Sequence, residues 1–492
     1  MTLASNTRQI FFRLLPLILF LAAFLVRIYD LGRQSFWFDE SVQAMIASTP
    51  AQSAMVNYVR TDQAAGMPLD FLIAWLVGHV TLDEGWFRLP YVIWGSLTVV
   101  VAYFLFLHLA SRPVAITAAA LLVFNPFLVY YAQEARFYST LLFFYTLETW
   151  LLLRAFQDPL KKNWLVLAVA ALIGSYFHIY TLFAFINGFA WLLFSRSQGP
   201  VPRKTYVSFL VTGAVVFLVF LPGFLYFSVF TSASWPFVPQ AILSAPLQGV
   251  GWLPLIQSNV GNLLAFLSLA LGLLGVFIAW RHRQAWLVAL FISSFDQLVL
   301  LLALDIIRHY LVASRQFIFL LPFAALFTAI GLASLAAWLC RPLPKIRDKL
   351  DAYLLRPNWV LGFLALVLLG LSIATLKVDF STPKSNAREL SQALKNEWTP
   401  GEVVYVAPVY IPTLFEYYFE KRYASPQLAA SLKGLDWDHL DWIPSDGPQT
   451  YLVTSGCDES YVDKIQSLGF SPYPGFTCAA SPYVLWIRYK IN

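Results

Sequence analysis

The sequence predicts a polytopic α-helical membrane protein with about eleven transmembrane helices, interfacial helices in its first outer loop and a small C-terminal extracytoplasmic α/β domain. Hydrophobic residues make up 59% of the 492 residues and charged residues only 12%, and the mean hydropathy is +0.65. This composition does not suit a soluble globular domain. Apolar segments of about 20 residues, long enough to cross a hydrocarbon core of roughly 30 Å, recur along the chain.

The first apolar segment runs from Ile10 to Tyr29. Arg8 and Arg13 precede or open it as in a signal peptide, but the apolar run continues for a full span without a small-residue cleavage site, so we expect a retained helix. A hydropathy window of about 19 residues predicts ten further spans, which are Leu89–Leu109, Val114–Tyr131, Phe137–Ala155, Trp164–Tyr180, Leu182–Phe194, Tyr206–Phe227, Leu263–Trp280, Trp286–Leu304, Phe317–Trp338 and Trp359–Leu376.

The basic residues predict the orientation of these spans. If the N-terminus is cytoplasmic, the loops on its side carry most of the Lys and Arg, as the positive-inside rule requires. The last of these loops is the most basic, with Arg341, Lys345, Arg347, Lys349 and Arg356. We therefore expect a multi-pass inner-membrane protein whose chain after Lys377 lies outside the cytoplasm. The net charge of +6 follows from these loops, so we expect no nucleic-acid partner.

Two domains are expected, a transmembrane catalytic domain over residues 1–377 and an extracytoplasmic α/β domain over residues 378–492. Within the first, residues 30–88 form a long outer loop whose apolar residues recur at helical spacing, which indicates helices lying in the membrane interface. In the second, Val403–Val406, Tyr451–Val453 and Val484–Ile487 are typical of buried strands. Cys457 and Cys478 lie in this external domain and form either a disulfide or two free thiols.

The polar groups that suggest chemistry gather at one membrane face. Asp39 and Glu40 directly follow the first span, where carboxylates are expensive to keep without a function. On the same predicted side lie the segment Tyr130-Tyr131-Ala132-Gln133-Glu134-Ala135-Arg136-Phe137-Tyr138, then His178, and then Arg308 and Arg315. The loops of the opposite face are only basic.

These residue types suit transfer of a group from a phosphate anchored in the membrane. A carboxylate can take the proton from an attacking hydroxyl. Arginine can pair with phosphate oxygens in a bidentate way that lysine cannot match. Because the groups face away from the cytoplasm, soluble activated donors are not at hand, and a lipid-linked donor is the natural alternative.

The motifs in their order resemble the integral-membrane glycosyltransferases of the C superfold (GT-C). The branch concerned contains the protein O-mannosyltransferase-like enzymes of the family-39 type and the aminoarabinose transferases of lipid A. The matching residues are Arg27, Tyr29-Asp30-Leu31-Gly32, Trp37-Phe38-Asp39-Glu40, Phe87-Arg88-Leu89-Pro90 and Tyr131-Ala132-Gln133-Glu134-Ala135-Arg136-Phe137-Tyr138.

The resemblance implies inverting transfer of a sugar from a polyprenyl-phosphate donor to an acceptor hydroxyl outside the cytoplasm. Asp39 would then be the general base, and Glu40 would position Asp39, the acceptor or a metal. Arg136 would neutralise the donor phosphate, and Glu134 would bind sugar or acceptor. The full set of substrate-binding candidates is Arg27, Glu134, Arg136, Tyr138, His178, Arg308 and Arg315.

No cofactor follows from the sequence. A divalent metal is possible, with Asp39, Glu40 and His178 as its candidate ligands. The expected partners are a polyprenyl-phosphate sugar, membrane lipids and an acceptor protein, glycan or lipid. Two other functions stay open: a flippase or transporter for polyprenyl-linked lipids, and a ligase that takes oligosaccharide from a lipid diphosphate.

Overall fold

A computed structural model describes residues 2–61, 67–195, 201–227, 239–251, 253–254, 256–308, 313–340, 357–444, 449–456, 459–476 and 482–489. The contacts within the chain divide it into two compact units. The first unit comprises residues 1–29, 59–70 and 89–380, and the second comprises residues 30–58, 71–88 and 381–492. Each unit is described by itself below.

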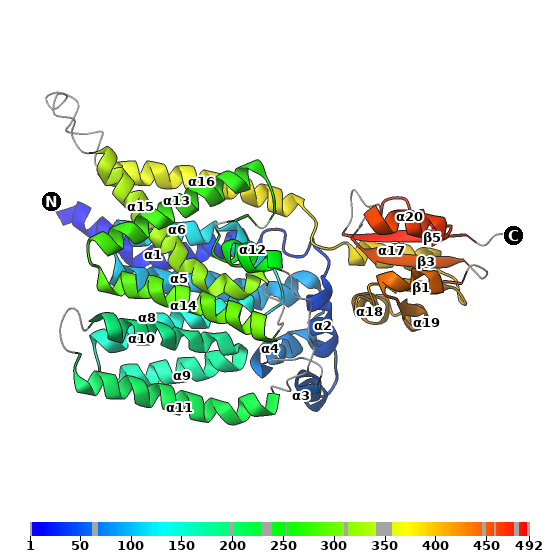
Figure 1. Ribbon diagram of the computed structural model, residues 1–492, viewed down its shortest axis with the longest axis horizontal. Coiled ribbons are helices and arrows are strands. Elements are labelled where there is room, and N and C mark those ends of the chain that lie inside the picture. The colour runs from blue at the N-terminus through cyan, green and yellow to red at the C-terminus, as the bar shows by residue number, and fades with distance from the viewer. Residues whose placement is uncertain are drawn as a thin grey trace. The chain divides into compact units, whose positions relative to one another are not determined.

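The first unit is helical throughout its described part (Figure 1). Its helices are α1 (Thr2–Ile28), α5 (Glu84–Leu109), α6 (Arg112–Val123), α7 (Pro126–Ala132), α8 (Tyr138–Gln157), α9 (Lys161–Phe177), η1 (Ile179–Phe183), α10 (Ala184–Ser195), α11 (Arg203–Phe227), α12 (Pro239–Gly249), α13 (Asn259–Arg281), α14 (Ala285–Arg308), η2 (Ser314–Leu320), α15 (Leu321–Leu339) and α16 (Pro357–Ser381). Two of them, α5 and α16, extend by a few residues into the second unit.

Each of the eleven predicted spans overlaps one or more of these helices. Within the described residues, six helices are long and apolar enough to cross a membrane, or seven if α6 and α7 form one span bent by 51°. The multi-pass membrane fold is thus confirmed, while the count of eleven spans stays a prediction. The helix α12 was not anticipated, because Pro246 and its polar neighbours interrupt the apolar run there.

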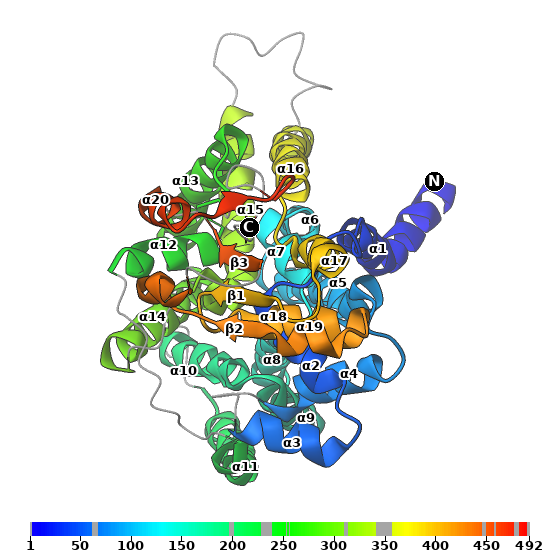
Figure 2. The same ribbon diagram turned by 90° about the vertical axis from the view of Figure 1, so that its right-hand side faces the viewer.

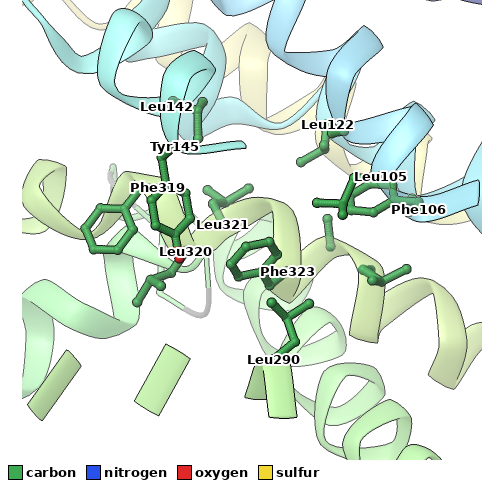
Figure 3. Close-up of a cluster of buried hydrophobic side chains, with 14 of the residues drawn as sticks. Leu105, Phe106, Leu122, Leu142, Tyr145, Leu290, Phe319, Leu320, Leu321 and Phe323 are labelled. Carbon is green, nitrogen blue, oxygen red and sulfur yellow. The ribbon is translucent and has the colours of Figure 1, made fainter. Parts of the chain in front are cut away.

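Large apolar side chains from distant parts of the chain form the core of the first unit. Figure 3 shows Tyr145 of α8 beside Phe319 of η2 and Phe323 of α15. The Tyr145 ring centroid lies 4.8 Å from that of Phe319 and 5.8 Å from that of Phe323. Such tilted pairs add to the free energy gained from burying the rings.

A buried polar network joins α8, α10 and α14 inside this core. The Asn187 amide donates to the Tyr145 hydroxyl and to Thr149 Oγ1, each at 3.0 Å. Its carbonyl oxygen accepts from Ser293 Oγ at 2.7 Å and from Gln297 Nε2 at 2.9 Å. Because the amide makes all four of its hydrogen bonds with side chains that are buried, the network fixes the register of the three helices.

The second unit contains the first outer loop as well as the C-terminal chain. Its elements are α2 (Phe38–Ala47), most of α3 (Gln52–Thr61) and α4 (Pro68–Gly78), then α17 (Ala387–Glu397), β1 (Val403–Ala407), α18 (Pro412–Glu416), the π-helical segment η3 (Tyr417–Arg422), α19 (Pro426–Ala430), β2 (Leu432–Gly434), η4 (Trp437–Trp442), β3 (Thr450–Ser455), α20 (Glu459–Ser467), β4 (Ser471–Pro472) and β5 (Tyr483–Arg488). The interfacial helices predicted for the outer loop thus correspond to α2, α3 and α4.

One five-stranded sheet organises the C-terminal part, in the order β2-β1-β3-β5-β4. Figure 2 shows β2, β1 and β3 side by side. These three strands are parallel, and β5 is antiparallel to both β3 and β4. The central strands β1, β3 and β5 are buried over nearly their whole length, which is why they read as continuous apolar runs. The three strands predicted from the sequence lie within them.

The division into units differs from the expected domain boundary in one respect. The sequence assigned the whole outer loop, residues 30–88, to the transmembrane domain, whereas most of it belongs to the second unit. The reason is a set of polar contacts between the loop and the C-terminal chain. For example, Ser385 Oγ donates to Phe36 O at 2.8 Å, and the Tyr417 hydroxyl donates to Leu82 O at 2.9 Å.

Candidate active site

In the first unit, a sharp break in the helices contains the predicted polar segment. Asn125 begins α7, with its side-chain oxygen accepting from Leu128 N at 3.0 Å and Pro126 at the first helical position, which is the pattern of a helix start. The chain leaves the helix again at Gln133 and resumes it at Tyr138. Residues 133–137 therefore present their side chains from a non-helical turn.

Arg27 supports this turn from α1. Its guanidinium donates to Val123 O and Leu122 O, each at 3.1 Å, and so satisfies carbonyls left without partners at the end of α6. The Gln133 amide in turn donates to Arg27 O at 2.9 Å and to Tyr29 O at 2.8 Å. The side chain of Arg27 is fully buried. These contacts show that Arg27 binds backbone carbonyls of α1 and α6, while its expected contact with substrate stays a prediction.

The Phe137 ring contacts both Arg136 and His178. The Phe137 ring stacks on the His178 imidazole at 4.2 Å, and the Arg136 guanidinium lies 5.5 Å from the Phe137 centroid. Arg136 is near enough to act electrostatically on His178. His178 Nδ1 accepts from Tyr180 N at 3.2 Å, so the neutral imidazole carries its hydrogen on Nε2.

Arg315 lies near two tyrosines of the same polar segment, Tyr138 and Tyr131. The Arg315 guanidinium lies 5.9 Å from the Tyr138 centroid and is hydrogen-bonded to the Tyr131 side chain. The two tyrosine rings meet edge to face at 5.1 Å. Glu134 is buried and acts electrostatically on Tyr131. The structure thus gathers five predicted residues, Glu134, Arg136, Tyr138, His178 and Arg315, around one set of contacting aromatic rings.

The first unit also contains an apolar groove of about 250 Å³. Leu182 of η1 lines it, four residues after His178, and the rest of the lining comes from α10 and α11. The lining residues are Leu182, Phe185, Phe189, Phe209, Leu210, Gly213, Ala214, Val216 and Phe217. With hydrocarbon walls throughout, the groove suits an aliphatic chain.

In the second unit, Asp39 and Glu40 occupy the first turn of α2, where carboxylates interact favourably with the helix dipole. They differ sharply in their surroundings. Glu40 is buried and receives two hydrogen bonds of 2.7 Å from Arg88, one from Nε and one from Nη2. Asp39 is only partly buried. The pair of acids therefore contains one carboxylate held in an ion pair and one at the surface of the unit.

Arg88 also holds the backbone that leads into α2. Its Nη1 donates to Leu31 O at 3.0 Å and Gln34 O at 2.8 Å, and its Nη2 donates to Ser35 O at 3.1 Å. One buried guanidinium thus fixes both the loop before α2 and the helix itself. The sequence analysis noted Arg88 only as part of a motif, because nothing local to residue 88 indicates its partner.

A second buried carboxylate, Glu84, joins the outer loop to the C-terminal chain. The Tyr418 hydroxyl donates to Glu84 Oε1 at 3.2 Å and accepts from Phe36 N at 2.7 Å. Arg388 and Arg422 lie 3.4 and 3.7 Å from the Glu84 carboxylate. Burial, and next the charge of Glu84, raise the pKa of Tyr418 well above its usual value. The phenol therefore stays protonated and keeps its donor function.

The side chains of several other residues expected at the site or in a disulfide are not described by the structure. The Arg308 side chain, Cys457 and Cys478 lie outside the described residues, as does the basic loop over residues 341–356. Among the residues that the structure does describe, no group of three or more His, Cys, Asp or Glu side chains could hold a metal ion. Of the candidate metal ligands, Glu40 already has both carboxylate oxygens on Arg88.

The Arg88 contacts predict a large loss of stability when this side chain is shortened. Replacing Arg88 by Met leaves the Glu40 charge buried without its partner, which costs about 3–5 kcal/mol. We expect thermal unfolding in detergent, followed by tryptophan fluorescence, to begin at a clearly lower temperature for Arg88→Met than for wild type.

The matched control is Arg33→Met. Arg33 forms an exposed ion pair with Asp30 at 3.0 Å, and such surface pairs contribute about 0–1 kcal/mol. Equal unfolding temperatures for Arg88→Met and Arg33→Met would contradict the role given to the buried pair.

Comparison with known proteins agrees with this architecture. Residues 67–226 match the family model of dolichyl-phosphate-mannose-protein mannosyltransferases. ArnT from Cupriavidus metallidurans bound to undecaprenyl phosphate has a TM-score of 0.54 at 15% identity, over 96% of this chain and 97% of that chain. The archaeal oligosaccharyltransferase AglB from Archaeoglobus fulgidus, with an inhibitory peptide and a dolichol-phosphate, has a TM-score of 0.53 at 11% identity, over 90% of this chain and 70% of that chain.

No curated protein matches the sequence. Identities of 11–15% establish the shared fold, while activity has to be argued from the site itself. The match to the family model adds a sequence relationship over residues 67–226, and the resemblance predicted from the motifs is confirmed. The chain is thus a multi-pass membrane protein that shares the fold of ArnT and AglB, and its residues 67–226 match the family model of dolichyl-phosphate-mannose-protein mannosyltransferases.

Proposed function

We propose that this protein transfers a sugar from a polyprenyl-phosphate donor to an acceptor hydroxyl, on the extracytoplasmic side of the inner membrane. The observation that carries the proposal is the gathering of Arg136 and Arg315 with His178 on stacked aromatic rings in an apolar helical unit. Arginines kept in such surroundings indicate an anionic ligand. The side of the membrane follows from the alternation of basic loops.

The donor side of the reaction is assigned to the first unit. Arg136 and Arg315 pair with the oxygens of the donor phosphate, and the apolar groove beside η1 takes part of the isoprenoid chain. The ArnT structure is bound to undecaprenyl phosphate and the AglB structure is in complex with a dolichol-phosphate, which supports a lipid phosphate as the ligand here. His178, with its hydrogen on Nε2, can donate to a phosphate or sugar oxygen.

The proposed reaction is a single displacement. Asp39 accepts the proton of the acceptor hydroxyl, and the hydroxyl oxygen forms a bond to the anomeric carbon. The bond between that carbon and the phosphate oxygen breaks, and the polyprenyl phosphate leaves with the electron pair. Its negative charge is already compensated by arginine, so the leaving group needs no proton.

Glu40 is assigned a positioning role. Because Arg88 binds both of its carboxylate oxygens, Glu40 holds the first turn of α2 in place. It therefore acts through Arg88 and the helix start, and not by contact with acceptor or metal. Of the two adjacent acids, Asp39 is therefore the one to which we assign the proton transfer.

Two alternatives differ from this proposal in their donor or product. An oligosaccharide ligase takes its glycan from a lipid diphosphate, whereas the proposed enzyme takes one sugar from a monophosphate. A flippase moves the lipid between leaflets without breaking the bond to the sugar. Offering both donor classes to the purified protein, and measuring release of free lipid phosphate, separates the three functions.

The proton transfer predicts a large kinetic effect at Asp39. Replacing Asp39 by Asn removes the base while keeping the size of the side chain, so transfer of radiolabelled sugar should fall about 10²–10⁴-fold. Binding of the polyprenyl-phosphate donor should be unchanged. The measurement uses protein in nanodiscs, labelled donor and an envelope extract as the source of acceptor.

Asp30→Asn is the matched control, since Asp30 lies in the same loop but pairs with Arg33 at the surface. It should keep wild-type transfer. Transfer by Asp39→Asn at the rate of Asp30→Asn would exclude Asp39 as the base.

The donor contacts predict a separate effect on binding. Hydrogen bonds to charged groups contribute about 1.5–3 kcal/mol, so Arg136→Ala should bind polyprenyl phosphate roughly 10–100-fold more weakly. Arg136→Lys should recover part of the loss. Arg154→Ala changes an exposed arginine that lies over Trp150 in the last turn of α8, toward the opposite predicted face, and should bind like wild type. Wild-type affinity in Arg136→Ala would remove Arg136 from the donor site.

A further inference from the structure

The C-terminal part of the second unit supplies an aromatic side chain next to the proposed base. Tyr410 lies in the turn between β1 and α18. Its ring meets that of Phe38, the residue before Asp39, edge to face at 5.3 Å. Although this contact holds one edge of the ring, Tyr410 remains 49% exposed. A half-exposed aromatic ring therefore contacts the residue directly before Asp39.

A second tyrosine lies close to the same place. Tyr483 begins β5, where its backbone is held by two hydrogen bonds with the Asn386 side chain, at 2.8 and 2.9 Å. Its buried ring meets that of Phe415 edge to face at 5.7 Å. Burial, then the proximity of Tyr410 and Asp39, raise the pKa of Tyr483. Asp39 and Tyr410 thus both lie within electrostatic range of one rigidly held, protonated phenol.

The neighbouring surface is apolar rather than charged. Val409, directly before Tyr410, is also about half exposed. The β1–α18 turn packs closely against Gly434 of β2. A Cβ atom added at Gly434 would lie only 2.9 Å from Val409 O. A half-exposed aromatic ring and an apolar neighbour on this closely packed turn thus lie against Phe38, the residue of α2 that directly precedes the Asp39 carboxylate.

This combination matches the chemistry of a sugar ring. A pyranose presents C–H groups on its faces, which pack against an aromatic ring, and hydroxyl groups at its edge, which donate to a carboxylate. We infer that Tyr410 is an acceptor-binding residue, and that the acceptor presents a carbohydrate ring which packs on Tyr410 with its hydroxyl toward Asp39. The inference rests on the proposed transferase function and adds the chemical class of the acceptor.

Binding of defined probes tests this inference without any turnover. The probes are methyl glycosides of common hexoses and pentoses and, separately, an acetylated threonine peptide, each offered to the full chain in nanodiscs. Saturation-transfer NMR then reports which protons of each probe contact the protein. We expect ring C–H signals from at least one glycoside with wild type, and no comparable signal from the peptide.

The variants locate the contact. Loss of one aromatic face should weaken glycoside binding roughly three- to tenfold in Tyr410→Ala, and Tyr410→Phe should keep it. Trp442→Ala is the matched control, because Trp442 is an exposed aromatic of the same unit, 69% accessible and packed on His439. Binding of polyprenyl phosphate, measured on the same samples, should be equal in all of these variants.

Three results would overturn the inference. The first is equal glycoside binding by wild type and Tyr410→Ala, and the second is the absence of glycoside binding by wild type. The third is a peptide signal that depends on Tyr410, which would assign a protein acceptor instead. Failure of the proposed function is recognised separately, because wild type would then release no free polyprenyl phosphate from a polyprenyl-phosphate sugar.

Discussion

The buried ion pair between Arg88 and Glu40 is the interaction on which the second unit depends. Arg88 uses one guanidinium to bind a carboxylate and three backbone carbonyls, so the loop before α2 and the start of α2 have a single anchor. A buried charge of this kind is tolerated only when its partner is present and its hydrogen bonds are complete. The position of Asp39, one residue before Glu40, follows from this anchor.

This ion pair is also the reason that the adjacent acids Asp39 and Glu40 are assigned different roles. Glu40 forms an ion pair with Arg88. Glu84 accepts a hydrogen bond from Tyr418 and forms ion pairs with Arg388 and Arg422. Asp39 is the more exposed carboxylate and lies beside Tyr410 and Tyr483. A site with one carboxylate for proton transfer suits a single displacement, whereas a covalent intermediate needs a second carboxylate as nucleophile. The contacts of Glu40 therefore bear directly on the proposed mechanism.

The helices and most of the donor-side cluster could be predicted from the sequence, whereas the anchor could not. Apolar runs mark the helices, and His178 and Arg315 were expected near Arg136 because all three lie at ends of spans on one predicted side. The pairing of Glu40 with Arg88 joins residues 48 positions apart, and no local pattern encodes it. The backbone contacts of Arg27 could not be predicted for the same reason, because the sequence around an arginine at the end of a span does not show that it binds, as here, the carbonyls of Leu122 and Val123.

The measurement that tests the mechanism most directly is the anomeric configuration of the product. A polyprenyl-phosphate sugar of known configuration is converted by the wild-type protein, and NMR of the purified product gives the configuration of the new bond. Direct attack by a hydroxyl that Asp39 deprotonates gives the opposite configuration to that of the donor. Retained configuration would require an intermediate bound to a second group, and would contradict both the single displacement and the division of roles between Asp39 and Glu40.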